Sequence, residues 1–93
     1  MLELVTTGQF RKDYKRLKKR GYDLKLLEEV IESLQKEQAL AQRYRDHGLL
    51  GNYAGFRECR ILPDWLLIYV VDKGKLLCLQ SSRRVLHTIS QNQ

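Results

Sequence analysis

Apolar positions at helical spacing predict two consecutive helices in the first third of the chain. A short apolar strand over residues 2–6 comes first, and Thr6 or Thr7 is available to cap the helix that follows, since a threonine hydroxyl accepts from a free amide of the first turn. The apolar stripe of this helix is narrow and consists of Phe10, Tyr14 and Leu17. Gly21 supplies the stop that is common just past a helix end.

The second predicted helix begins after Asp23, which is a favourable capping residue. Its core-facing positions recur at intervals of three and four and are Leu27, Val30, Ile31 and Leu34. Glutamates occupy its outer face, whereas the first helix is basic. Because antiparallel neighbours of opposite charge attract each other, we expect a helical hairpin that leaves a basic face free.

Three strand-like runs fill most of the last third of the chain, at residues 56–62, 65–71 and 75–80. The connections at 63–64 and 72–74 suit tight hairpins, so consecutive strands should be antiparallel. The run 65–71 is apolar on both faces and is therefore expected to be the central strand, covered by the helices on one side.

The order of predicted elements is β-α-α-β-β-β, with an irregular, glycine-bearing connection over residues 39–55. This order predicts one α+β domain over residues 1–93, in which two N-terminal helices pack on a small, mainly antiparallel sheet. A chain of 93 residues buries only a modest core, so a large internal cofactor cavity is not expected.

The net charge and the composition of the chain indicate which kinds of partner it can bind. The net charge of +6 and the pI near 9.6 favour a polyanion. No apolar run approaches the roughly 20 residues that span a bilayer, and the first residues lack the pattern of a signal peptide, so we expect a cytoplasmic protein without a membrane partner. Cys59 and Cys78 are too few for a zinc site and are expected to be core residues in a reducing compartment.

Basic residues at the two ends of the chain are candidate phosphate ligands. On the first helix these are Lys12, Lys15, Arg16 and Lys19, which would make RNA binding dependent on salt. A solvated helix face is the alternative. In the tail, Arg83 and Arg84 precede His87, and arginine pairs bind phosphate with directed hydrogen bonds. A frayed basic terminus is the alternative there.

The middle of the chain carries side chains that could transfer protons. His47 lies in the glycine-bearing loop, and histidine is a side chain that can transfer protons near neutral pH, although a lone loop histidine is often incidental. Glu58 and Arg60 project from one face of a strand, where they could simply pair with each other. Asp64 follows Pro63 and could be only a turn residue, and Trp65 could anchor the core or stack on a base.

Taken together, these groups include a base, an acid and fixed positive charge, which is what RNA cleavage by internal 2′-hydroxyl attack requires. That route needs no metal and no cofactor, and the chain has no clustered set of carboxylate or Cys/His ligands for a metal.

Several ordered motifs resemble the YafQ-type branch of the RelE toxin superfamily, whose members read D-H-x-L, G-x-W, G-x-R-[DE]-x-H and P-D-x-x-L-x-Y. The matching segments are DHGL at 46–49, GNY at 51–53, GFRECR at 55–60 and PDWLLIY at 63–69. Residues 8–15 also resemble the first helix of that family. The resemblance covers nearly the whole chain, and the ordered string is specific where each single motif is weak.

The resemblance implies a RelE-like fold and a ribosome-dependent endoribonuclease that cuts messenger RNA and leaves a 5′-hydroxyl. It also implies a cognate antitoxin, encoded by the adjacent gene, that covers the basic surface with an acidic, partly disordered segment. DNA would then be contacted only indirectly, through the antitoxin.

In family terms, His47, Glu58, Asp64 and Trp65 match residues that line the site, and Arg57 is expected to contact RNA. The sequence departs from the family pattern at two places, residue 60 and the tail. Arg60 stands where the family has a histidine, and it can stabilise negative charge but cannot act as a base.

The closing family pattern, R-x-G-[ST]-H, is poorly kept. Ungapped alignment places Val85 at its histidine, whereas a two-residue shift places His87 there, and we prefer His87, with Arg83 and Arg84 as phosphate ligands. An attenuated module that binds antitoxin and RNA without cutting is therefore the alternative to an active nuclease.

Overall fold

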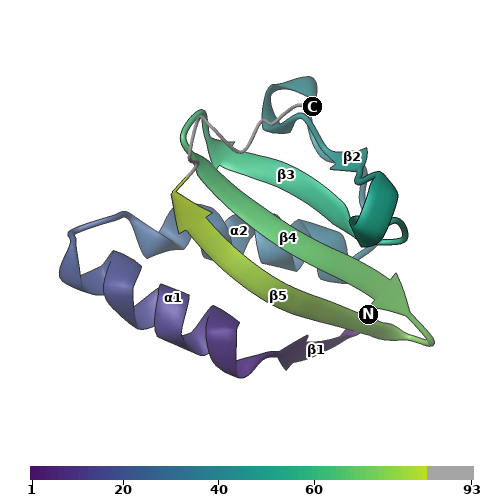
Figure 1. Cartoon of the computed structure of the whole chain (residues 1–93), viewed down its shortest axis with the longest axis horizontal. Coiled ribbons are helices and arrows are strands. Elements are labelled where there is room, and N and C mark those ends of the chain that lie inside the picture. Colours follow the sequence, from purple (N-terminus) through teal and green to yellow (C-terminus); the bar gives the residue numbers. More distant parts are fainter. Residues whose placement is uncertain (84–93) are drawn as a thin grey trace.

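The computed structural model describes residues 1–83 as two helices packed on one face of a five-stranded sheet (Figure 1). The α+β class is confirmed, and the predicted helices and strands occur in the predicted order with one additional short strand, β2. The elements are β1 (Glu3–Thr6), α1 (Gly8–Lys19), α2 (Leu24–Gln35), β2 (His47–Gly48), β3 (Arg57–Leu62), β4 (Trp65–Asp72) and β5 (Lys75–Arg83), with short 3-10 turns at Gln42–Tyr44 (η1) and Gly51–Tyr53 (η2).

Local sequence sets the ends of both helices. The side chain of Thr7 accepts a hydrogen bond from the amide of Phe10 at 3.0 Å and so caps α1. Asp23 caps α2 in the same way through the amide of Lys25 at 3.1 Å. Gly21 has a φ of +80°, a left-handed conformation that glycine adopts without steric cost. The predicted caps and stop are therefore confirmed, and Thr7 rather than Thr6 is the cap.

The strand order in the sheet is β1-β5-β4-β3-β2. The strand β4 lies at the centre, as predicted, and pairs antiparallel with β3 and β5. Two features were not predicted: β1 pairs parallel with β5, and the two-residue strand β2 pairs with β3. The strand β5 also continues to Arg83, three residues past its predicted end.

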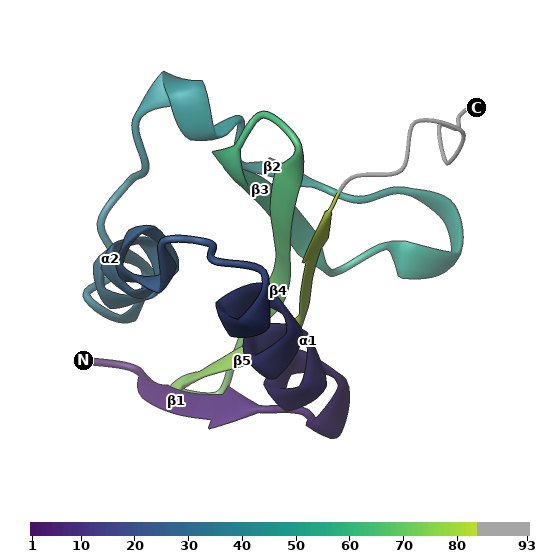
Figure 2. The ribbon, with the colours of Figure 1, turned by 90° about the vertical axis from the view of Figure 1, so that its left-hand side faces the viewer.

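The helices cover one face of the sheet and leave the other face open. In Figure 2, α2 lies on one side of the strands and the segment with η2 on the other. The expected helical hairpin forms only in part, because α1 packs mainly against β5 and α2 packs against β3. The two helices are nevertheless linked by a hydrogen bond from the hydroxyl of Tyr14 to Glu28 at 2.7 Å.

Alternation along β3, β4 and β5 decides which side chains reach each face. The helix-facing positions form one buried core that includes Leu27, Trp65, Leu67, Leu76 and both cysteines. A bulge at Leu79 in β5 shifts the pairing, since Ile68 pairs with Gln80 whereas Tyr69 pairs with Cys78. After the bulge, Ser81 faces the core and its even-numbered neighbours face the open side.

Candidate active site

Two rows of side chains cross the open face of the sheet. Pairing places Glu58, Ile68 and Gln80 in the first row. The second row, two residues further along the strands, holds Arg60, Leu66 and Ser82. Residues two apart on one strand are separated by about 7 Å, and neighbouring strands by about 5 Å. The acidic and basic side chains of β3 are therefore close enough to act on one phosphodiester.

The imidazole of His47 joins the first row from β2, where His47 pairs with Glu58. Its Nδ1 lies 2.6 Å from the carbonyl oxygen of Arg45. A carbonyl can only accept, so Nδ1 carries a proton and Nε2 is the atom left for chemistry. Nε2 lies 3.4 Å from Oε1 of Glu58. Half of the His47 side chain is exposed, so a substrate oxygen can reach the same nitrogen.

The turn between β3 and β4 brings Asp64 to the end of β5. Nε of Arg83 lies 3.7 Å from Oδ2 of Asp64, and both side chains are more than half exposed. An exposed pair of this kind contributes little to stability, so Arg83 remains available to a phosphate. The other predicted tail residues, Arg84 and His87, lie outside the described residues.

A groove of about 660 Å³ runs over the open face beside these groups. Its apolar lining comes from the loop before β3 and from the sheet and comprises Leu49, Tyr53, Phe56, Leu66, Ile68 and Leu79. Its polar lining includes Glu58, Gln80 and Arg83. Apolar and aromatic walls beside cationic groups suit the faces of nucleobases and the phosphates that link them.

The loop that carries His47 is tied to the sheet through Asp46, whose carboxylate accepts from the hydroxyl of Tyr69 at 2.6 Å and from Nε of Arg57 at 3.3 Å. Burial, followed by the hydrogen bond to Asp46, raises the pKa of Tyr69. Hydrogen bonds to Tyr69 and Asp46 raise the pKa of Arg57. The Asp46–Tyr69 pair was not anticipated, although both residues stand inside the motifs of the sequence.

Arg57 was predicted to contact RNA, and the structure places it at the start of β3 beside Asp46. About half of its side chain is exposed, so its bond to Asp46 does not seal it from a ligand.

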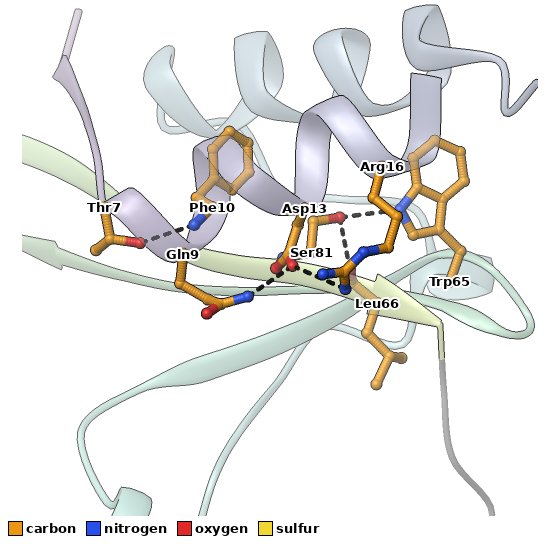
Figure 3. A network of polar contacts seen from close by, with 8 residues as sticks. All are labelled: Thr7, Gln9, Phe10, Asp13, Arg16, Trp65, Leu66 and Ser81. Atoms are coloured by element: carbon orange, nitrogen blue, oxygen red, sulfur yellow. Dashed lines mark hydrogen bonds and ion pairs between the residues drawn. The ribbon is translucent and has the colours of Figure 1, made fainter. Parts of the chain in front are cut away.

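Trp65 does not face the groove. Its side chain is fully buried and forms an edge-on contact with Tyr22, with the ring centroids 5.1 Å apart. Figure 3 shows the hydrogen bond that its Nε1 donates to Oγ of Ser81, at 2.9 Å. The prediction that Trp65 stacks on a base is therefore wrong, because a side chain with no exposed surface cannot touch RNA. The alternative of a core anchor is confirmed.

A second interaction that sequence reasoning missed centres on Asp13 of α1, which is buried although it belongs to a basic helix. Its carboxylate accepts from the amide of Ser81 at 3.0 Å and from Nε2 of Gln9 at 2.8 Å (Figure 3). This contact fastens α1 to the last part of β5. The available signal was the position of Asp13, three residues after Phe10 and four before Leu17 on the apolar stripe.

The predicted basic residues of α1 are all exposed, but the structure separates them. Lys12, Lys15 and Lys19 do not line the groove, whereas Arg16 lies beside Asp13 near the end of β5. Within residues 1–83, no three or more His, Cys, Asp and Glu side chains gather in a way that could hold a metal ion. None of the helices in this part of the chain is long and apolar enough to cross a membrane.

The fold and the site define a class of small α+β proteins whose open sheet face presents a histidine, carboxylates and guanidinium groups. Residues 2–87 match the family described as the bacterial toxin of type II toxin–antitoxin system, YafQ. The chain belongs to this YafQ family, within the RelE superfamily of toxins.

Relatives and solved structures agree with this assignment. The mRNA interferase toxin YafQ of Escherichia coli K12 is 38% identical over 73 residues, which cover 76% of this chain and 79% of that protein. A metal-bound toxin from Helicobacter pylori is 42% identical, with a TM-score of 0.84 over 89% of this chain and 94% of that one. YafQ in the E. coli DinJ–YafQ complex is 28% identical, with a TM-score of 0.82 over 99% of this chain and 100% of that one.

Proposed function

We propose that the protein is a ribosome-dependent endoribonuclease that cleaves messenger RNA by attack of a 2′-hydroxyl on the adjacent phosphorus. The observation that carries the proposal is the juxtaposition of His47 and Glu58 in one row with Arg60 in the next, on the open face beside the groove. The E. coli relatives named mRNA interferase toxins support the class of reaction.

In the proposed reaction, the 2′-oxygen forms a bond to phosphorus as its proton passes to a base. Among the described residues, Asp64 in the turn between β3 and β4 is the candidate for this base. Nε2 of His47, which lies 3.4 Å from Oε1 of Glu58, gives a proton to the departing 5′-oxygen. The P–O5′ bond breaks, and the products are a 2′,3′-cyclic phosphate and a 5′-hydroxyl.

Guanidinium groups supply the fixed positive charge. Arg60 and Arg83 would stabilise the charge that develops on the phosphorane oxygens. We assign Arg84 the same role and His87 a share in proton transfer, on the resemblance of the tail alone.

The test is cleavage of messenger RNA on purified ribosomes, read by primer extension. The His47→Gln variant should cut at least a hundredfold more slowly, because a positioned acid or base contributes about 10²- to 10⁴-fold. The matched control is Gln42→Ala, a change at an exposed residue of the same loop, which should cut at the normal rate. Intact messenger RNA with the unmodified protein, or full activity of the His47 variant, would refute the proposal.

The second candidate, an attenuated module that binds without cutting, is favoured by one observation, namely Arg60 at the position of the family histidine. An arginine stays protonated and cannot accept a proton from the substrate. The Arg60→His variant separates the two candidates. A large gain in cleavage would assign attenuation to the natural protein, and an unchanged or lower rate would assign Arg60 to the stabilisation of charge.

The proposed partners are a cognate antitoxin from the adjacent gene, the ribosome and messenger RNA, with DNA reached only through the antitoxin and with the cytoplasm as location. The solved complexes of YafQ with DinJ support the antitoxin. An acidic segment would complement the +6 charge of this chain. Co-expression with the adjacent gene should restore growth and yield a co-purifying complex, and toxicity that the adjacent gene leaves unchanged would argue against this partner.

A further inference from the structure

A second hollow, of about 320 Å³, adjoins the groove at the end of β5. It lies between the last turns of α1 and the residues after the bulge. Ser82 and Arg83 line both hollows, so the two hollows meet at these residues. The other lining residues are Asp13, Arg16, Leu17, Arg20, Tyr22 and Ser81.

Three guanidinium groups border this hollow against one carboxylate. Arg16 lies on the last turn of α1, Arg20 is the residue that caps the end of this helix, and Arg83 joins them from β5. More than half of the side chain is exposed in Arg16 and in Arg83, so both can turn toward a ligand. The concentration of positive charge favours an anion, and arginine binds phosphate through paired hydrogen bonds.

The carboxylate of Asp13 offsets only one of the three positive charges in this lining, and its hydrogen bonds come from β5 and from Gln9 rather than from the arginines. Its oxygens accept from the amide of Ser81 and from Gln9, and only 4% of its side chain is exposed. NH1 of Arg16 lies 3.9 Å away, beyond hydrogen-bond distance (Figure 3). The engaged carboxylate instead fixes α1 against β5, which holds the arginines of the two elements beside one another.

We propose that this hollow is a phosphate subsite for the RNA strand that occupies the groove, at a linkage next to the one that is cut. The proposal rests on the proposed function for the identity of the strand. The groove lies on the open face and the hollow on the side of α1, and Ser82 and Arg83 line both, so an RNA strand that leaves the groove at Arg83 and passes around the end of β5 would reach the hollow. The subsite would fix the register of the strand and therefore the position of the cut.

The test uses a short single-stranded oligoribonucleotide with 2′-O-methyl riboses, which binds but cannot react, and fluorescence anisotropy at several salt concentrations. In the Arg16→Gln/Arg20→Gln variant we expect a loss of affinity of tenfold or more. The slope of log K against log salt should also fall by about 0.7, the value for one phosphate contact on a single strand. The control Lys25→Gln/Lys36→Gln removes the same charge from two exposed positions, one on α2 and one at its C-cap, and should lose less than threefold.

A second measurement locates the contact. Single linkages of the oligonucleotide are replaced by neutral methylphosphonates, one at a time. One replacement beside the cut should weaken binding to the unmodified protein and have no further effect on the Arg16/Arg20 variant, because the two changes remove the same interaction. Equal losses in both charge variants, additive effects at every linkage, or no measurable binding of the oligonucleotide would overturn the subsite.

Failure of the subsite and failure of the proposed function are distinguishable. Normal cleavage on ribosomes with no effect at Arg16 and Arg20 would remove the subsite alone. A positive binding result from a protein that never cuts RNA would keep the subsite and remove the nuclease.

Discussion

Replacement of Trp65 by phenylalanine should weaken folding without a direct effect on RNA. The variant loses the hydrogen bond from Nε1 to Ser81, which contributes about 1 kcal/mol. It also loses part of the contact with Tyr22 and leaves a cavity where the indole was, so the total is about 2–3 kcal/mol. Ser81 keeps its own acceptor, the carbonyl of Leu66 at 2.8 Å, so no hydroxyl is stranded.

For a domain of this size, 1 kcal/mol shifts the melting temperature by about 4–8 °C, so the variant should melt roughly 10–20 °C lower. Circular dichroism is the appropriate assay, because Trp65 is the single tryptophan and the variant has no indole fluorescence. In the unmodified protein the same indole should resist quenching by acrylamide. At a temperature where both proteins are folded, cleavage on ribosomes should agree within about threefold. An unchanged melting temperature together with a tenfold loss of cleavage would refute this reasoning and would indicate that Trp65 contacts RNA.

Three further predictions concern buried polar groups and thiols. The Tyr69→Phe variant loses the hydrogen bond from the Tyr69 hydroxyl to Asp46, so the free energy of unfolding should fall by about 1–2 kcal/mol. Backbone amides of the loop before β3 should then exchange with solvent faster, and unchanged exchange would contradict this anchoring role. Burial raises the pKa of both Cys59 and Cys78 from 9.0 to about 12, so the folded state keeps protons that the unfolded chain releases. The free energy of unfolding should therefore fall as pH rises above about 9, by roughly 1.4 kcal/mol per thiol per pH unit, and alanine at both cysteines should flatten this slope in urea titrations. The Asp13→Ala variant leaves the buried amide of Ser81 without an acceptor, so the free energy of unfolding measured in urea should fall by about 2–4 kcal/mol. The Asp13→Asn variant keeps an acceptor oxygen and should lose less, and equal losses in the two variants would argue against the hydrogen bond.

Most of the fold could be predicted because its signals are local. Thr7 and Asp23 mark the helix starts, and the apolar run of β4 marks the central strand. The parallel pairing of β1 with β5 could not be predicted, since the paired residues are seventy-two positions apart and no turn connects them. The strand β2 is two residues long, too short for any periodicity to appear, and the bulge at Leu79 leaves no mark in the pattern.

The candidate site, too, could be predicted from the sequence only in part. Period-two alternation predicted that Glu58 and Arg60 share a face, and the structure places both on the open side. Trp65 is buried because it is the first residue of β4, and the odd-numbered residues of this strand face the helices. A match to a sequence motif does not reveal which face a residue occupies. Asp13 was missed because its partner, the amide of Ser81, lies on an element sixty-eight residues away and reaches the helix side only after the bulge.

The parallel pair of β1 and β5 also sets an order of assembly. The strand β1 is synthesised before the other four strands of the described sheet and is joined only to β5, so it stays an open edge until residues 75–78 have emerged. Long-range pairing of this kind slows folding. A nascent copy of this chain therefore completes its sheet, and with it the end of β5 that carries Arg83, only after all of Lys75–Arg83 has been synthesised.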